Sequence, residues 1–182
     1  MPTVDPRIRL RAVTPDLWEC HRDLRLEMLA DAPDAFWATL AEAEAMTDEQ
    51  WRARTAGPLV HLQALVATAD GEELAGSLGI DPVGYTEDLP LDADTVNVVA
   101  VYVRPAFRGR RVVRALVAGA ADVVRGMGRD RLLLEVTSDN APARRAYERL
   151  GFTETGRTHP DPRRGSGFCE VEYEARLGDL RL

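Results

Sequence analysis

The chain has 182 residues, 45% of them hydrophobic, and this suits one domain, residues 1–182, with a substantial core. Its formal net charge of −7 argues against a nucleic-acid partner and favours a cationic substrate such as an amine, although a plain acidic surface gives the same charge. No apolar run approaches the ~18 residues of a membrane helix, and the N-terminus lacks the apolar stretch of a signal peptide. We therefore expect a cytoplasmic protein with no membrane partner.

The cysteines and histidines do not have the spacing of a metal site. Cys20 and Cys169 are far apart, and no second histidine lies at ligand spacing from His21. We therefore expect free thiols and no bound metal.

The chain also has no lysine, which excludes a G-x-x-x-x-G-K-[ST] phosphate loop. No G-x-G-x-x-G follows the first predicted strand, which argues against a dinucleotide fold.

Hydrophobic periodicity and turn residues divide the chain into strands and helices. The first half contains a strand over 7–13, a helix from Thr14 or Asp16 to about Asp31, a helical region in two short pieces over about 40–53 with Trp51 facing inward, and a hairpin of strands 61–68 and 73–80 with its turn at Asp70-Gly71. The second half contains a polar loop over 81–94, a strand over 95–103, an arginine-rich helix ending at Gly126 and Gly128, a strand over 132–136, a helix from Pro142 to Gly151, a strand over 152–157, a mobile connection over 159–167 and a strand over 168–177. This order predicts an α/β fold, with one mixed sheet of about seven strands and helices on both faces.

The most informative stretch lies where the strand over 95–103 ends and the next helix begins. Pro105 stops the strand. Four arginines and a glycine then crowd the start of the helix: Arg108, Gly109, Arg110, Arg111 and Arg114. The helix dipole places partial positive charge there, so the arginines destabilise the helix unless an anion neutralises them. Free backbone N–H groups and guanidinium groups suit a phosphate or pyrophosphate, and the alternative is a solvated basic helix end.

The stretch Val103-Arg-Pro-Ala-Phe-Arg-Gly-Arg-Arg-Val-Val113 resembles the acetyl-CoA signature of the GNAT superfamily of N-acetyltransferases, which is Gln/Arg-x-x-Gly-x-Gly/Ala between a strand and a helix. A second block, Asn140-Ala-Pro-Ala-Arg-Arg-Ala-Tyr-Glu-Arg-Leu-Gly-Phe152, resembles that family's other cofactor-side motif at its usual separation. The resemblance covers nearly the whole chain and implies a GNAT-type single domain. Arg111 and Val113 depart from the family's small residues, which let the backbone approach the pyrophosphate closely.

The resemblance implies that acetyl-CoA is the co-substrate and that its acetyl group moves directly to a primary amine. The implied cofactor contacts on the strand are Val101, Tyr102 and Val103, because the pantetheine amides can pair with a strand edge. The implied contacts on the following loop and helices are Arg108, Gly109, Arg110, Arg111, Val112, Val113, Arg114, Asn140 and Tyr147. Asn140 can also cap the helix that follows it, and the two roles are compatible.

Transfer to an amine needs a base for the ammonium and an acid for the departing thiolate. Glu135 is the candidate base, because it is the one charge in the apolar run 132–136 and burial there would raise its pKa. It also resembles the base of N-acetyltransferases that modify protein N-termini, and the alternative is an edge-facing or salt-bridged glutamate. Tyr147 matches the family's general-acid tyrosine, and the alternative is a core tyrosine with a satisfied hydroxyl.

The acceptor site is defined by the resemblance alone. The region between the first two helices walls that site in the family, so Phe36 and Trp37 are candidate contacts, with ordinary core positions as the alternative. Asn97 stands where other branches have a catalytic glutamate; it can hold a water but cannot titrate. The acceptor is left open among a protein N-terminus, a polyamine, an amino acid and an antibiotic, that is, a small-molecule or peptide amine. A non-catalytic acyl-CoA-binding module is the rival function, and a homodimer is also left open.

Overall fold

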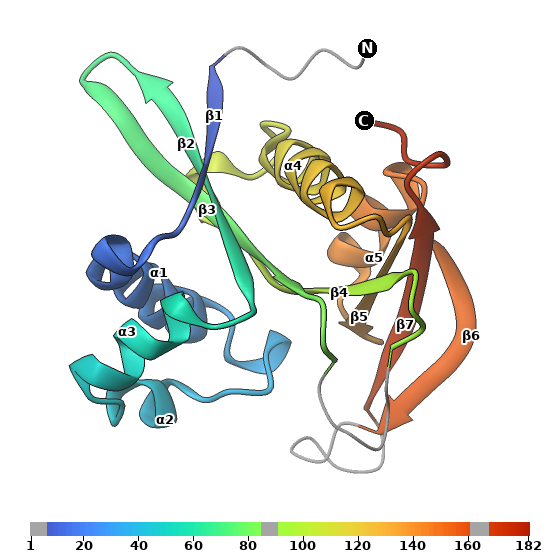
Figure 1. Cartoon of the computed structure of the whole chain (residues 1–182), viewed down its shortest axis with the longest axis horizontal. Coiled ribbons are helices and arrows are strands. Elements are labelled where there is room, and N and C mark those ends of the chain that lie inside the picture. The colour runs from blue at the N-terminus through green and yellow to red at the C-terminus, as the bar shows by residue number, and fades with distance from the viewer. Residues whose placement is uncertain (1–6, 85–90, 161–167) are drawn as a thin grey trace.

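The computed structural model describes residues 7–84, 91–160 and 168–182, and its elements follow the predicted order (Figure 1). They are β1 (Ile8–Ala12), α1 (Trp18–Asp31), α2 (Leu40–Glu44), α3 (Asp48–Ala56), β2 (Val60–Thr68), β3 (Gly71–Asp81), β4 (Thr95–Val103), α4 (Val112–Gly126), β5 (Arg131–Thr137), α5 (Ala141–Arg149), β6 (Thr153–Pro160) and β7 (Cys169–Arg176). Short 3-10 turns precede α1, follow it and precede α4. Within the described ranges, no helix has the length and apolar character needed to cross a bilayer.

The strands form one mixed sheet in the order β1-β2-β3-β4-β5-β7-β6. β4 and β5 run parallel, whereas every other neighbouring pair is antiparallel. Helices α1, α2 and α3 lie against one face of the sheet, and α4 and α5 against the other (Figure 1). Tyr102 accordingly packs in the core beneath α1 and α3, whereas Val103 packs in the core beneath α4. The predicted fold class is confirmed.

Helix α4 is the apolar support of the second face. Leu116, Val117, Ala120 and Val124 are fully buried, so the helical spacing of apolar residues in the sequence marks the face that meets the sheet. Gly119 lets this helix come close to the first strands, because a Cβ there would lie 2.4 Å from a methyl carbon of Leu10.

The sheet opens in its middle, between β4 and β5. Their parallel pairing covers Thr95–Asn97 with Arg131–Leu133 and then stops. Ala100 adopts a positive φ of 51°, and the β3–β4 register shifts beside it, so a bulge turns the rest of β4 away from β5. In Figure 1 the two groups of strands diverge beyond this point. The remainder of β4 therefore keeps a sheet edge that β5 does not occupy.

Two predicted boundaries need correction. The α-helix expected from Thr14 or Asp16 begins at Trp18, because Pro15–Leu17 forms a 3-10 turn and the Thr14 side chain makes no capping bond. The connection expected over 159–167 is wrong for His159 and Pro160, which pair with β7 at the end of edge strand β6. Residues 161–167 of that connection, and 85–90 of the polar loop, lie outside the described residues.

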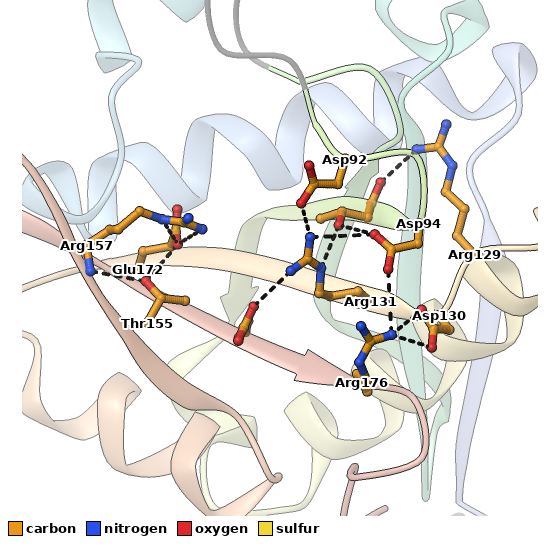
Figure 2. Close-up of polar contacts among 11 residues, drawn as sticks. Asp92, Asp94, Arg129, Asp130, Arg131, Thr155, Arg157, Glu172 and Arg176 are labelled. Carbon is orange, nitrogen blue, oxygen red and sulfur yellow. Dashed lines mark hydrogen bonds and ion pairs between the residues drawn. The ribbon is translucent and has the colours of Figure 1, made fainter.

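An arginine at the start of β5 holds the parallel junction together (Figure 2). The Arg131 Nε donates to the Thr95 hydroxyl in β4 at 2.7 Å, and its Nη1 lies 3.3 Å from a Glu174 carboxylate oxygen in β7. The guanidinium also pairs with Asp92 and, at 3.5 Å, with Asp94 just before β4. One side chain therefore ties together the strands on both sides of the opening. The Thr95 hydroxyl, which is almost fully buried, accepts this bond and donates to an Asp94 carboxylate oxygen at 2.9 Å, so losing Arg131 would remove the donor that it accepts from.

Replacing this arginine should destabilise the fold. We expect Arg131→Leu to lower the free energy of unfolding by about 2 kcal/mol, since it removes charge-assisted bonds from a largely buried guanidinium group. The matched control is Arg125→Leu, which removes an exposed pair with Asp122 and should change stability by less than about 0.5 kcal/mol. Urea unfolding at pH 7 measures both values, and equal losses in the two variants would contradict the proposed importance of the junction.

Candidate active site

Two cavities meet where β4 and β5 diverge. The larger one, which we call the groove, has a volume of about 700 Å³ and lies between the second half of β4, the start of α4 and α5. The smaller one, which we call the inner cavity, has a volume of about 370 Å³ and lies between α1, α3, β4, β5 and β7. Their common wall consists of Ala35, Phe36, Val101, Asn140, Ala143 and Tyr147. The groove is therefore continuous with a second, more enclosed space.

The groove gathers most of the cofactor contacts that the sequence predicts. The predicted residues that line it are Val101, Tyr102, Val103, Arg108, Gly109, Arg111, Val112, Val113, Arg114, Asn140 and Tyr147. Arg110 is not among its lining residues, and its guanidinium lies 5.7 Å from the centre of the Phe107 ring. Loop, helix and strand thus contribute to one surface.

The start of α4 presents free donors to the groove. The N–H of Ala115 makes the first helical bond, to the Arg111 carbonyl at 3.0 Å. The three preceding amides of the helix have no carbonyl before them in the helix and point out of its N-terminus. Together with Arg111 and Arg114, which also line the groove, they form an environment suited to a phosphate or pyrophosphate group.

Arg108 is engaged in the free protein. Its Nε donates to the Val103 carbonyl at 3.0 Å, and its Nη2 lies 2.5 Å from an Asp31 carboxylate oxygen at the end of α1. The side chain is about half exposed, so the pair with Asp31 is open to water. An incoming anion would therefore compete with this carboxylate for the guanidinium.

Arg111 occupies a backbone conformation that favours glycine. It precedes α4 with φ 64° and ψ 12°, in the left-handed region. A side chain there costs on the order of 1 kcal/mol, and this accounts physically for a glycine at the fourth position of the motif. Arg111 keeps this strained conformation, and its side chain lines the groove.

The edge of β4 that does not pair with β3 faces the groove. The N–H of Arg104 bonds to the Ala75 carbonyl in β3 at 2.9 Å. Because successive residues of a strand alternate the side to which their backbone groups point, the N–H groups of Val103 and Val101 point away from β3. That is the side from which β5 has separated. The edge is therefore open to an extended chain with amide groups.

Glu135 lies in the inner cavity and is 16% exposed. It faces Glu172 across the β5–β7 pair, and its Oε1 lies 3.5 Å from the Nε2 of His159. Burial raises the pKa of Glu135; His159 opposes the rise, and the Glu172 carboxylate adds to it. The alternative of an edge-facing glutamate is wrong, whereas an ion pair with His159 is compatible with a base in a cavity.

The ligand-type atoms of Glu135, His159 and Glu172 come within 4.8 Å of one another, a grouping that the sequence spacing did not indicate. One oxygen of Glu172 already accepts from Thr155 at 2.7 Å and from Arg157 Nε at 2.7 Å (Figure 2). The arrangement is thus a network of ion pairs in which His159 lies between two carboxylates.

Tyr147 stands between the two cavities. It lies on α5, is 7% exposed, and its ring packs edge-on against Phe152 with centroids 5.7 Å apart. Burial raises the pKa of Tyr147, so the phenol keeps its proton at neutral pH. Among the described residues its hydroxyl makes no hydrogen bond. Asn140 caps α5, accepting from the Ala143 N–H at 3.2 Å, and it lines both cavities.

The structure separates the three candidate acceptor residues. Phe36 and Trp37 both line the inner cavity. Trp37 is 50% exposed, so the core alternative is wrong for this residue. Asn97 is buried in β4 beside Asp81 of β3 and is not among the residues that line either cavity.

The sequence did not point to several residues that line the inner cavity. Arg25 of α1, Arg54 of α3 and Glu170 of β7 all line the inner cavity. His159 lies in β6, where the sequence predicts a connection. The alternating glutamates of the last strand were the available signal, because a buried strand seldom carries charges without partners.

Comparisons with known proteins agree with this architecture. The model of the acetyltransferase (GNAT) family matches residues 14–152. The chain is 38% identical over 88 residues to streptothricin acetyltransferase from Streptomyces lavendulae, covering 48% of this chain and 42% of that protein. It is 45% identical over 62 residues to mycothiol acetyltransferase from Beutenbergia cavernae, covering 34% and 21%. The match thus spans less than half of either relative.

A solved structure shares the fold across nearly the whole chain. The spermidine N-acetyltransferase from Vibrio cholerae, in complex with CoA and spermine, superposes with a TM-score of 0.71 at 14% identity, covering 96% of this chain and 98% of that one. The family match, which covers most of the chain, is the stronger finding. The chain therefore belongs to the GNAT family of acetyltransferases.

The strained residue before α4 gives a direct test of the groove. Arg111→Gly should keep the affinity for acetyl-CoA within about tenfold, because relief of the backbone offsets the lost guanidinium contact. Isothermal calorimetry measures this affinity. Complete loss of binding would show that the loop depends on the Arg111 side chain and does not follow the family pattern.

Proposed function

We propose that the protein is an acetyl-CoA-dependent N-acetyltransferase that moves an acetyl group to a small-molecule primary amine by direct transfer. One observation carries the proposal: the groove and the inner cavity meet at Tyr147, and the raised-pKa carboxylate of Glu135 lies in the inner cavity. The volume of about 370 Å³ suits a small molecule. Two relatives are named for streptothricin and mycothiol, which supports a small-molecule acceptor.

The groove offers acetyl-CoA two kinds of contact. Free amides at the start of α4, with Arg111 and Arg114, would bind its phosphates. The open β4 edge at Val101 and Val103 would pair with the amides of its pantetheine arm. These contacts would direct the thioester end towards Tyr147, where the groove meets the inner cavity.

Glu135 and Tyr147 divide the proton work in this proposal. Bound acetyl-CoA supplies the acetyl group as a thioester. The Glu135 carboxylate takes a proton from the acceptor ammonium, directly or through one water, and burial, which raises its pKa, makes it a stronger base than an exposed glutamate. His159, 3.5 Å away, stabilises the carboxylate form between turnovers. Tyr147, kept neutral by burial, gives its proton to the departing sulfur.

Kinetics from pH 6 to 9 test these roles. Because the base acts as a carboxylate, the rate should fall as pH drops through the raised pKa of Glu135. Glu135→Gln should lower kcat by about 10²–10⁴-fold and remove that acidic limb. Tyr147→Phe should lower kcat by a similar factor and leave acetyl-CoA affinity nearly unchanged.

The control is Glu73→Gln, which removes an exposed carboxylate from the β2–β3 hairpin and should keep the wild-type profile. If both site variants retain wild-type rates across the range, water carries the protons and the assigned roles fail. If wild type binds acetyl-CoA but acetylates no amine, the chain is an acyl-CoA-binding module.

A further inference from the structure

The inner cavity has a cationic end. Arg25 from α1 and Arg54 from α3 both line it, and we call them the arginine pair. The Arg25 guanidinium lies 5.8 Å from the centre of the Phe36 ring, and its Nη1 is 3.9 Å from the Met28 sulfur. The Nε of Arg54 is buried with no hydrogen-bond partner. Within the described residues, neither guanidinium forms an ion pair with a carboxylate.

Two buried histidines lie next to the arginine pair but are not among the residues that line the inner cavity. The rings of His21 and His61 are in contact, with centroids 4.2 Å apart and planes tilted by 44°, and they share a small cavity with the arginine pair. Burial, followed by nearby positive charges, lowers the pKa of His21 to about 4 and of His61 to about 3. Both rings are therefore neutral at pH 7 and contribute polar atoms without charge.

Several buried polar atoms in this part of the molecule lack hydrogen-bond partners. The Nε2 atoms of His21 and His61 and the Nε2 of Gln63 are buried and lack partners within the described residues, as does the Arg54 Nε. Such atoms are costly unless a ligand, ion or water pairs with them. Burial, followed by the charge of Arg54, also lowers the pKa of Arg25 to about 10. An anion bound in the inner cavity could pair with the two guanidinium groups that line it, including the unpartnered Arg54 Nε.

The inner cavity is also lined by carboxylates. Glu135 of β5 and Glu170 of β7 line it, whereas the arginine pair comes from helices α1 and α3 on the other side of the sheet opening. The cavity therefore presents cationic side chains from the helices and anionic side chains from the strands. A ligand that carries both charges would complement both.

On the basis of the proposed function, we propose that the acceptor is an amino-acid-type zwitterion, whose carboxylate binds to Arg25 and Arg54 while its primary amine faces Glu135. Guanidinium groups match a carboxylate in geometry, because two parallel N–H bonds can reach its two oxygens. A simple polyamine would leave the arginine pair without a counter-ion. The net charge of −7 gave no sign of this site, because the two cations are enclosed in an acidic protein.

Matched acceptors test the proposal. Thiol release from acetyl-CoA is followed with each free amino acid, with the amine that lacks its carboxylate, and with its carboxamide. We expect at least one amino acid to show a kcat/KM at least tenfold above both of its neutral-end analogues. Equal or better turnover of the analogues would overturn the proposal and leave the acetyltransferase function standing.

Variants of the arginine pair add a second test. Arg25→Met and Arg54→Met should raise KM for the preferred amino acid by about tenfold to a hundredfold, the range for a lost charged hydrogen bond. They should change kcat/KM for the carboxylate-free amine by less than about threefold. The control is Arg52→Met, on the same helix as Arg54 but exposed and stacked 4.5 Å from the Trp18 ring centre. Equal losses for both kinds of acceptor would overturn the assignment.

Stability separates this role from a structural one. Removing an unpaired buried charge should leave the melting temperature of Arg54→Met at or above that of wild type. A large fall would mean that the arginine supports the fold, and would count against the proposal.

If wild type acetylates no amine, the acetyltransferase function fails. Calorimetry with N-acetylated amino acids then decides the anion site: binding lost in Arg54→Met supports it, and no binding to wild type overturns it.

Discussion

The short parallel pairing between β4 and β5 is the constraint on which the rest of the site depends. Three residues of each strand pair, and Arg131 binds this junction to Thr95 and to β7. Beyond it, the bulge at Ala100 turns β4 away, so one sheet ends with two diverging edges. The groove and the inner cavity both exist because these edges do not pair. The cost of a strained residue and unpaired strand edges is offset where a ligand can use them.

The same opening separates two electrostatic environments. The groove has free amides and guanidinium groups at the start of α4, which favour phosphate. The inner cavity has carboxylates from β5 and β7 facing arginines from α1 and α3. Tyr147 lies at the boundary, neutral because it is buried. The groove and the inner cavity thus carry different sets of charged groups, and the net charge of −7 does not reveal this difference.

The sequence predicted the fold and the groove well, because both depend on local patterns. The apolar stripe of α4, the continuous run of β5 and the two motifs are contiguous in the chain, and their order defines the sheet. The inner cavity was harder to predict. Arg25 and Arg54 lie on helices whose apolar spacing is weak, and their approach to β5 depends on tertiary packing. The sequence predicts a loop at His159 because prolines follow it closely, whereas pairing with β7 extends the strand through this residue.

Hydrogen exchange with and without acetyl-CoA tests the central claim most directly. If the cofactor occupies the open β4 edge and the start of α4, backbone amides in 98–103 and 109–116 should exchange more slowly with saturating acetyl-CoA. Amides of β2 (Val60–Thr68), already paired on both sides within the sheet, should show no change. Protection confined to other segments, or none at all despite saturation measured by calorimetry, would contradict the account of the opening as the cofactor site.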